Sequence, residues 1–152
     1  MFKNEIDMLD LAILRASTHH YKQRNKGGEP YMCHVMRVML KCDSLKAKTV
    51  AIMHDLLEDC DYTVKNLRDD GFPDDIIGAL ILLNHNKDVD YLEYIKHLSS
   101  NELAVEVKIA DLEDNSNCLR FPDSKNFDKW VDRKLVNYYK AYRFLKYGET
   151  CD

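Results

Sequence analysis

The sequence has few residues that break helices and no long apolar run. Of its 152 residues only five are glycine and three are proline, so tight strand corners are rare and long helices are favoured. No apolar stretch approaches the roughly 20 residues that span a bilayer, and no apolar signal-peptide core follows the N-terminus. These absences predict a cytoplasmic protein without a membrane partner.

Basic runs and paired cysteines are missing as well. Lys and Arg number 22 against 26 Asp and Glu, which gives a formal net charge of −4. A mildly acidic chain without a basic run binds nucleic acids poorly, so we expect no nucleic-acid partner. The five cysteines form no C-x-x-C pair, which argues against a zinc–thiolate cluster or a disulfide framework and favours reduced thiols.

Helical periodicity is what the chain does contain. Hydrophobic residues make up 45% and charged residues 32%, a composition typical of a folded domain. Apolar residues recur at helical spacing along the chain, and Ser44, Thr63 and Asn101 are placed to cap helices. We expect an all-α protein of seven or eight helices, one domain over residues 1–152, with the last helix at about 126–147.

One predicted helix carries polar groups beside an apolar face. After the apolar run 50–53 the chain reads His54-Asp55-Leu56-Leu57-Glu58-Asp59. In a continuous helix His54 lies one turn before Glu58. Asp55 likewise lies one turn before Asp59, so the four side chains form two adjacent stripes. Burying such groups is costly unless a cation compensates their charge.

Further polar residues lie in two other predicted helices. Asp111 and Asn115 are one turn apart, and Lys108 precedes Asp111 by three residues on the same face. His34 lies on the helix that Pro30 opens. Four side chains are the candidate ligands of one metal ion: His34, His54, Asp55 and Asp111.

This ligand set indicates which metal ions the site would bind and what they would do to a bound water. Two imidazoles and two carboxylates suit Mn²⁺, Fe²⁺ or Zn²⁺ better than Ca²⁺. A divalent cation makes hydroxide available near neutral pH because it lowers the pKa of bound water. Glu58 and Asp59 lie one turn beyond the ligands, where they can orient that water or shuttle a proton.

Each of these residues also has an ordinary structural interpretation. His34 can be a hydrogen-bonded core histidine, and Glu58 with Asp59 can be a solvated helix end. Lys108 either neutralises a substrate phosphate or pairs with Asp111. The metal hypothesis therefore depends on the combination of residues and not on any one of them.

Three segments of the chain combine these polar residues with specific neighbours: HYKQ and KGGEPYMCH within 20–34, MHDLLEDCDYT at 53–63 and VKIADLEDN at 107–115. In this order they resemble the HD-domain metal-dependent phosphohydrolases, and within that family the (p)ppGpp hydrolase domain. The resemblance spans about residues 8–120. It implies an HD-domain helical bundle that hydrolyses (p)ppGpp to GDP or GTP plus pyrophosphate with one Mn²⁺ ion. The chain lacks the length for a synthetase domain, so no synthetase activity is expected.

The resemblance also implies a role for each matched position. The Mn²⁺ ligands would be His34, His54, Asp55 and Asp111. Glu58 and Asp59 would position and activate the attacking water. Lys26 and Tyr31 would line the nucleotide pocket, and Asn115 would contact the nucleotide near its ribose or 3′ side.

Two positions depart from the pattern of these hydrolases. Asn25 stands where they usually carry arginine, with Arg24 one residue earlier, and Ser116-Asn117 stands where Leu-Arg is usual. Both differences concern the substrate and not the metal site. Two alternatives stay open: a nucleotide monophosphatase acting on deoxynucleotides or the 2′-phosphate of NADPH, and a module that senses a nucleotide without cleaving it. The oligomeric state is also open, with a homo-oligomer among the options.

Overall fold

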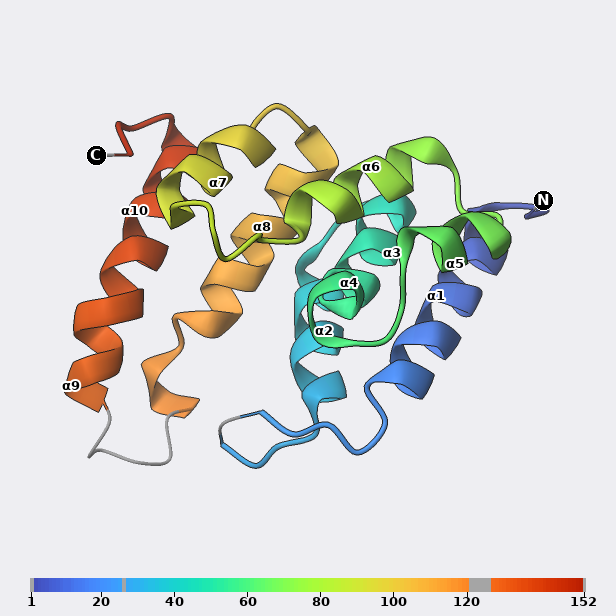
Figure 1. The fold of residues 1–152 in the computed structure, drawn as a ribbon, viewed down its shortest axis with the longest axis horizontal. Helices are drawn as coiled ribbons and strands as arrows, with labels where there is room; N and C mark the ends of the chain where they lie inside the picture. Colours follow the sequence, from blue (N-terminus) through green and yellow to red (C-terminus); the bar gives the residue numbers. More distant parts are fainter. Residues whose placement is uncertain (1, 26, 121–126, 152) are drawn as a thin grey trace.

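A computed structural model describes residues 2–25, 27–120 and 127–151 of the chain (Figure 1). Within these residues it contains helices and one isolated β-bridge, between Arg24 and Pro30, but no strand. This confirms the predicted all-α fold. The elements are α1 (Glu5–His19), α2 (Tyr31–Lys41), α3 (Leu45–Met53), α4 (Leu56–Asp59), α5 (Val64–Asp69), α6 (Asp74–Leu83), α7 (Tyr91–Leu98), α8 (Glu102–Asn115), the 3₁₀ helix η1 (Cys118–Arg120), α9 (Phe127–Trp130), the π-helical turn η3 (Val131–Leu135) and α10 (Val136–Tyr147).

Side-chain caps begin three of the helices where the sequence predicts them. The Ser44 hydroxyl accepts a hydrogen bond from a backbone N–H in the first turn of α3, and the Asn101 side chain does the same for α8. Thr63 and Asn66 form a reciprocal capping box at the start of α5. Each cap satisfies backbone donors that have no partner inside the helix.

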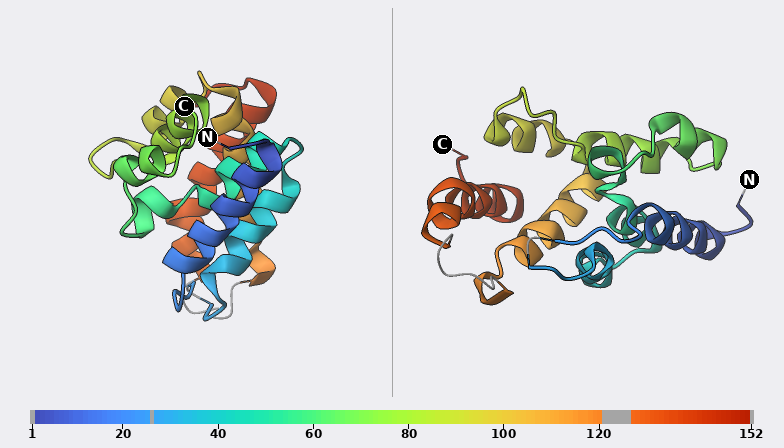
Figure 2. Two further views of the ribbon diagram at one scale, coloured as in Figure 1. Left: turned by 90° about the vertical axis from the view of Figure 1, so that its right-hand side faces the viewer. Right: turned by 60° about the horizontal axis from the view of Figure 1, so that its bottom comes forward.

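Helix α3 lies at the centre of the core. It contacts α1, α2, α6 and α8, and Figures 1 and 2 show these helices arranged around it. Its residues from Thr49 to Met53 are fully buried, as expected of a mostly apolar helical turn that neighbours surround on all sides. Contacts on several sides therefore fix the position of the backbone at the C-terminal end of α3.

The predicted continuous helix through residues 54–59 is wrong. The structure ends α3 at Met53 and starts α4 at Leu56, with His54 and Asp55 in a turn between them. The His54 ring Nδ1 binds the Ala51 carbonyl at 2.7 Å, and such a side-chain bond competes with the helical ladder. The break turns both polar side chains toward α2 and α8.

The C-terminal helices cover a second side of α8. Helix α10 packs on α8 and on α7 (Figure 2). The predicted last helix is interrupted by η3, where the turn widens between α9 and α10. All five cysteines are free, as predicted; Cys42 and Cys151 are buried, whereas Cys118 is exposed. In the described part of the chain, no helix has both the length and the apolar content to span a membrane.

Candidate metal centre

Three side chains from distant parts of the chain converge in the interior. His34 comes from α2, His54 from the turn after α3 and Asp111 from α8. Each offers one ligand atom, and these atoms lie within 4.8 Å of one another. All three residues are buried. The structure thus brings together three of the four predicted ligands in a group of the size that one ion can bridge.

The two imidazoles present the same nitrogen to this group. His34 Nδ1 lies 2.7 Å from an Asp114 oxygen, and His54 Nδ1 lies 2.7 Å from the Ala51 carbonyl oxygen. Because these neighbours only accept hydrogen bonds, each Nδ1 carries the proton in the neutral ring and Nε2 keeps a lone pair. His54 Nε2 is buried without a hydrogen-bond partner. The donor set therefore fits a divalent cation.

Asp55 lies beside the same group. Its Oδ2 is 3.1 Å from His54 Nε2 and 3.6 Å from His34 Nε2. The Tyr31 hydroxyl donates to this oxygen at 2.6 Å and lies 3.1 Å from Asp59 Oδ2. The predicted fourth ligand is thus placed at the centre and tied to a predicted water-activating residue through Tyr31.

Both oxygens of Asp111 are held by neighbours on its own helix. Lys108 Nζ donates to Oδ2 at 2.9 Å, and Asn115 Nδ2 donates to Oδ1 at 2.7 Å. The Lys108 ammonium also lies over the rings of Tyr91 and Tyr94, at 5.8 and 5.5 Å from their centroids. These contacts fix the carboxylate that faces the two imidazoles.

Carboxylates dominate the electrostatics of the centre. Burial disfavours a charge on His34, but hydrogen bonds to Asp111, Asp114 and Asp55 outweigh it and raise its pKa to about 11. Burial likewise opposes charge on His54, and the nearby carboxylates raise its pKa to about 10. The centre attracts positive charge, and protons and a metal ion compete for the same Nε2 atoms.

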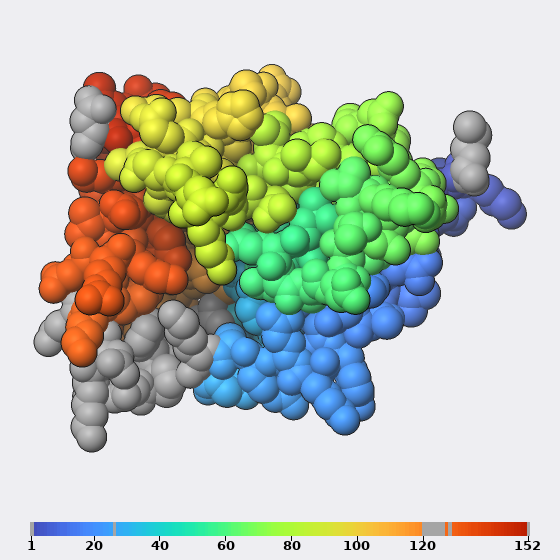
Figure 3. All heavy atoms as spheres, in the orientation of Figure 1, coloured from blue at the N-terminus to red at the C-terminus, as the bar shows by residue number. Residues whose placement is uncertain are grey.

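The centre opens into a cleft of about 1220 Å³. Asp55, Glu58, Asp59 and Asp111 line one part of it. Partial burial, then the charge of Asp55, raises the pKa of both Glu58 and Asp59, and the charge of Asp59 adds to the increase for Glu58. Five further lining residues are basic and are here together called the basic wall: Arg24, Lys87, Lys129, Arg133 and Lys134. In Figure 3 the surface is hollowed where the yellow, orange and blue parts of the chain meet.

The fold is shared with a solved structure of known activity. No protein-family model matches the chain. A metazoan ortholog of SpoT, which hydrolyses ppGpp and plays a role in starvation responses, superimposes with a TM-score of 0.72. The match covers 93% of this chain and 86% of that one, with 20% sequence identity. The two proteins have one fold.

A curated relative matches over a shorter stretch. It is the probable guanosine-3′,5′-bis(diphosphate) 3′-pyrophosphohydrolase of Mycoplasma genitalium, 31% identical over 67 residues. The matched stretch is 41% of this chain and 9% of the relative, so this chain spans a small part of that protein's length. Both comparisons agree with the resemblance that the three motifs carry.

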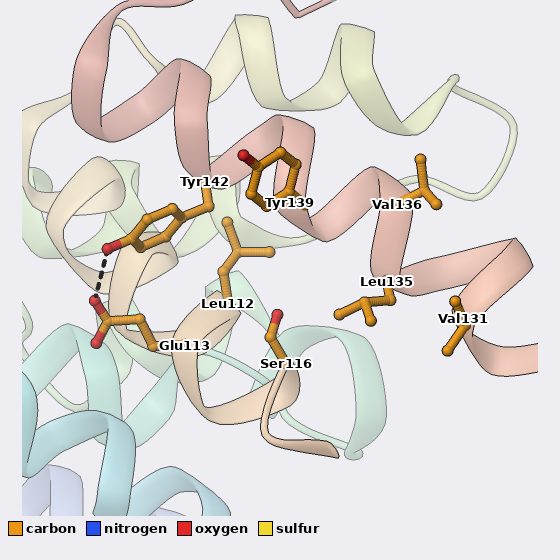
Figure 4. A pocket seen from close by; sticks show the side chains of 8 residues that line it. All are labelled: Leu112, Glu113, Ser116, Val131, Leu135, Val136, Tyr139 and Tyr142. Atoms are coloured by element: carbon orange, nitrogen blue, oxygen red, sulfur yellow. Dashed lines mark hydrogen bonds between the residues drawn. The ribbon is translucent and has the colours of Figure 1, made fainter. Parts of the chain in front are cut away.

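A second cavity has a different character. It holds about 420 Å³ between α8, η3 and α10, and its walls are almost entirely apolar (Figure 4). Leu112, Leu135 and Tyr139 point into it, and the polar contact drawn there joins Tyr142 to Glu113. Among the described residues that line it, the titratable groups are Glu113, Tyr139 and Tyr142, and none of the candidate metal ligands is among them.

The predicted substrate-binding residues differ in whether the structure places them at the cleft. Tyr31, Lys108 and Asn115 line the cleft, whereas Lys26 lies outside the described residues. Sequence reasoning missed Asp114, which is buried against His34, because an acidic residue near the end of a helix gives no signal of burial. It also did not single out Arg133, which lines the cleft.

Proposed function

We propose that this chain is a metal-dependent phosphohydrolase that hydrolyses (p)ppGpp to GDP or GTP and pyrophosphate. The observation that carries the proposal is the convergence of His34, His54 and Asp111, with Asp55 beside them, next to a cleft that Asp55, Asp111 and the basic wall line. A cation site facing several cationic side chains suits a substrate with phosphates at two ends. The shared fold and the curated relative support the same substrate.

The metal would be held by the four predicted ligands, His34, His54, Asp55 and Asp111. A divalent ion there, which we propose to be a single Mn²⁺, would polarise a phosphoryl oxygen and lower the pKa of a nearby water. Glu58 accepts the proton of the attacking water on its carboxylate, and Asp59 orients that water. The raised pKa of Glu58 brings this base nearer to neutral pH, where general bases act best.

The nucleotide would lie along the cleft with its 3′-diphosphate toward the acidic end. Asn115 and Lys108 hold Asp111 and face the cleft, so we propose that both also contact the substrate next to the reacting phosphorus. Tyr31 and Lys26 would line the nucleotide pocket. The basic wall would neutralise the 5′-phosphates. The motif-matched region 8–120 thus supplies the chemistry and the C-terminal helix supplies part of the wall.

The two alternative functions, a monophosphatase and a sensing module, would each need a different arrangement of residues in the cleft. A monophosphatase needs one phosphate site, whereas the basic wall offers several cations along the cleft. A sensing module needs no base, whereas Glu58 and Asp59 both face the cleft. These observations favour hydrolysis of a substrate with several phosphates. As a reaction of a free nucleotide it needs no nucleic-acid partner, and we propose the cytoplasm as its location.

A nucleotide panel tests this function. The purified protein is supplied with Mn²⁺ and offered (p)ppGpp, deoxynucleoside monophosphates and NADPH, and the products are separated by ion chromatography. We expect pyrophosphate and GDP or GTP from (p)ppGpp, with EDTA and His54→Ala abolishing release. Orthophosphate from the other substrates alone would establish the monophosphatase instead. Binding of (p)ppGpp with no product would establish the sensing module.

A further inference from the structure

A chain of four side chains connects the rim of the cleft to the metal centre. Both terminal nitrogens of Arg37 donate to Glu29, at 2.9 and 3.1 Å. Arg37 Nε donates to Asp114 Oδ1 at 2.7 Å. The other oxygen of Asp114 lies 2.7 Å from His34 Nδ1. The residues come from the loop before α2, from α2 itself and from α8.

Of these four hydrogen-bonded side chains, Asp114 is the one whose burial the sequence gives no reason to expect. It is only 5% exposed, and a carboxylate is costly to bury unless charged or polar partners satisfy it. Its partners are Arg37 on one side and the outer nitrogen of His34 on the other. Asp114 contacts the nitrogen that faces away from the ligand group, so it acts on the metal centre through His34.

We propose that Asp114 is a positioning residue that orients His34 toward the metal, and that Arg37 and Glu29 hold Asp114 in place. This inference rests on the proposed metal centre. An acceptor on Nδ1 fixes the tautomer and the rotation of the ring, which keeps the Nε2 lone pair directed at the ion. Arg37 thereby pairs with two carboxylates at once.

The same set of hydrogen bonds connects the loop before α2 to the metal centre. Asn25 Nδ2 donates to Glu29 at 3.0 Å, and Asn25 Oδ1 accepts the backbone N–H groups of Gly27 and Glu29. Asn25 and Gly27 line the cleft. The position of this loop and the orientation of His34 are therefore set by one continuous set of hydrogen bonds.

The test measures Mn²⁺ binding by isothermal titration calorimetry, without any nucleotide. Outer-shell changes cost metal sites about 10- to 100-fold in affinity, and we expect a loss of that size in Asp114→Asn and a smaller loss in Arg37→Met. The matched control is Lys41→Met. Lys41 pairs with Glu113 across the same two helices at 3.3 Å but does not touch His34, and we expect its Mn²⁺ affinity to equal that of the wild type.

A second measurement separates positioning from simple loss of structure. With diamagnetic Zn²⁺ bound in place of Mn²⁺, NMR should find the His34 Nδ1 proton far downfield in the wild type, as expected of a hydrogen bond to a buried carboxylate, and shifted upfield in Asp114→Asn. Thermal unfolding of the metal-free variants checks that they fold; if Asp114→Asn does not, Arg37→Met and Glu29→Gln provide the affinity test.

Two outcomes would overturn the inference in distinguishable ways. Unchanged Mn²⁺ affinity in a folded Asp114→Asn, or in both Arg37→Met and Glu29→Gln, would remove the positioning role and leave the proposed function intact. A wild-type protein that binds no Mn²⁺ would overturn the metal centre itself and the positioning role with it.

Discussion

The Tyr31 hydroxyl donates to Asp55 at 2.6 Å and also lies within reach of Asp59. One hydroxyl thus connects a proposed metal ligand to a carboxylate proposed to act on water. The ring of Tyr31 is held in turn by the buried ring of His20, whose centroid lies 4.9 Å away. Removing only the hydroxyl therefore tests a specific hydrogen bond and leaves the packing in place.

Tyr31→Phe should lower turnover with Mn²⁺ by about tenfold, because a hydrogen bond to a charged group contributes roughly 1.5–3 kcal/mol. The protein should still fold, with a lower thermal stability that reflects the lost hydrogen bond only, since the ring still packs on His20. Steady-state kinetics at saturating Mn²⁺ measure the effect. Tyr21→Phe is the control, because Tyr21 is 72% exposed; equal turnover in the two variants would contradict the role of the hydroxyl.

Glu58→Gln should lower kcat by about 10² or more, the usual contribution of a general base. The glutamine keeps the size of the side chain but cannot accept a proton. Mn²⁺ affinity should stay at the wild-type value, since Glu58 is not among the ligands. Rapid-quench kinetics together with calorimetry separate the two effects. Wild-type turnover in this variant would show that the base lies elsewhere.

Mn²⁺ should raise the thermal unfolding temperature of the wild type. An ion at 100 times its dissociation constant stabilises a folded protein by about 2.7 kcal/mol. His54→Ala should abolish this increase, because His54 Nε2 is one of the ligand atoms. Differential scanning calorimetry with Mn²⁺ and with EDTA measures it. His97→Ala, on the exposed side of α7, is the control and should respond to Mn²⁺ as the wild type does.

Arg133→Ala should raise KM for (p)ppGpp by about tenfold, which corresponds to roughly 1.4 kcal/mol of binding, and leave kcat nearly unchanged. The reason is that Arg133 belongs to the basic wall and lies away from the proposed ligands. Raising the salt concentration should diminish the difference, since salt screens exposed charges. Arg143→Ala is the control, because Arg143 pairs with Glu149 and does not line the cleft.

Asp70 makes the stability depend on pH. Two hydrogen bonds from Arg15 and one from Tyr62 hold its pKa below the usual range. A pKa lowered by folding stabilises the folded state above the unfolded pKa of about 3.9, and this contribution is lost as the pH falls through the folded pKa.

Asp70→Asn should therefore lower the free energy of unfolding at pH 7 by about 1–2 kcal/mol, a figure reduced because Arg15 is a third exposed. The difference from the wild type should shrink on acidification below pH 4. Urea unfolding at several pH values measures it. Asp69→Asn, whose pair with Lys65 is exposed, should change stability by less than about 0.5 kcal/mol; a constant Asp70→Asn effect down to pH 2 would contradict the assignment.

Local signals in the sequence predicted most of the fold. Caps at Ser44, Thr63 and Asn101 set the starts of three helices, because capping depends on neighbours within four residues. The break at His54 was not predictable in the same way. It accompanies the bond from the His54 ring to the Ala51 carbonyl three residues earlier, and the sequence alone does not reveal whether a histidine ring bonds to its own helix.

The candidate site likewise combines residues that the sequence predicted with residues that it did not. His34, His54 and Asp111 could be predicted because metal ligation demands particular residue types, and the motifs preserve them in order. Asp114 could not, because its partner Arg37 lies 77 residues earlier and each of the two residues alone resembles a surface charge. The role of Arg133 was hidden as well, since only the packing of α10 on α8 brings its part of the chain to the cleft.

The last helical stretch, in which the π-helical turn η3 joins α9 to α10, has two different sides. Trp130, Arg133 and Tyr138 line the cleft, whereas Val131, Leu135 and Tyr139 line the apolar cavity. A π turn holds one residue more than an α turn, so deleting Asp132 would restore a regular α turn and keep α10 in register. The same deletion inside α10, at Lys140, would instead turn every later residue by about 100°.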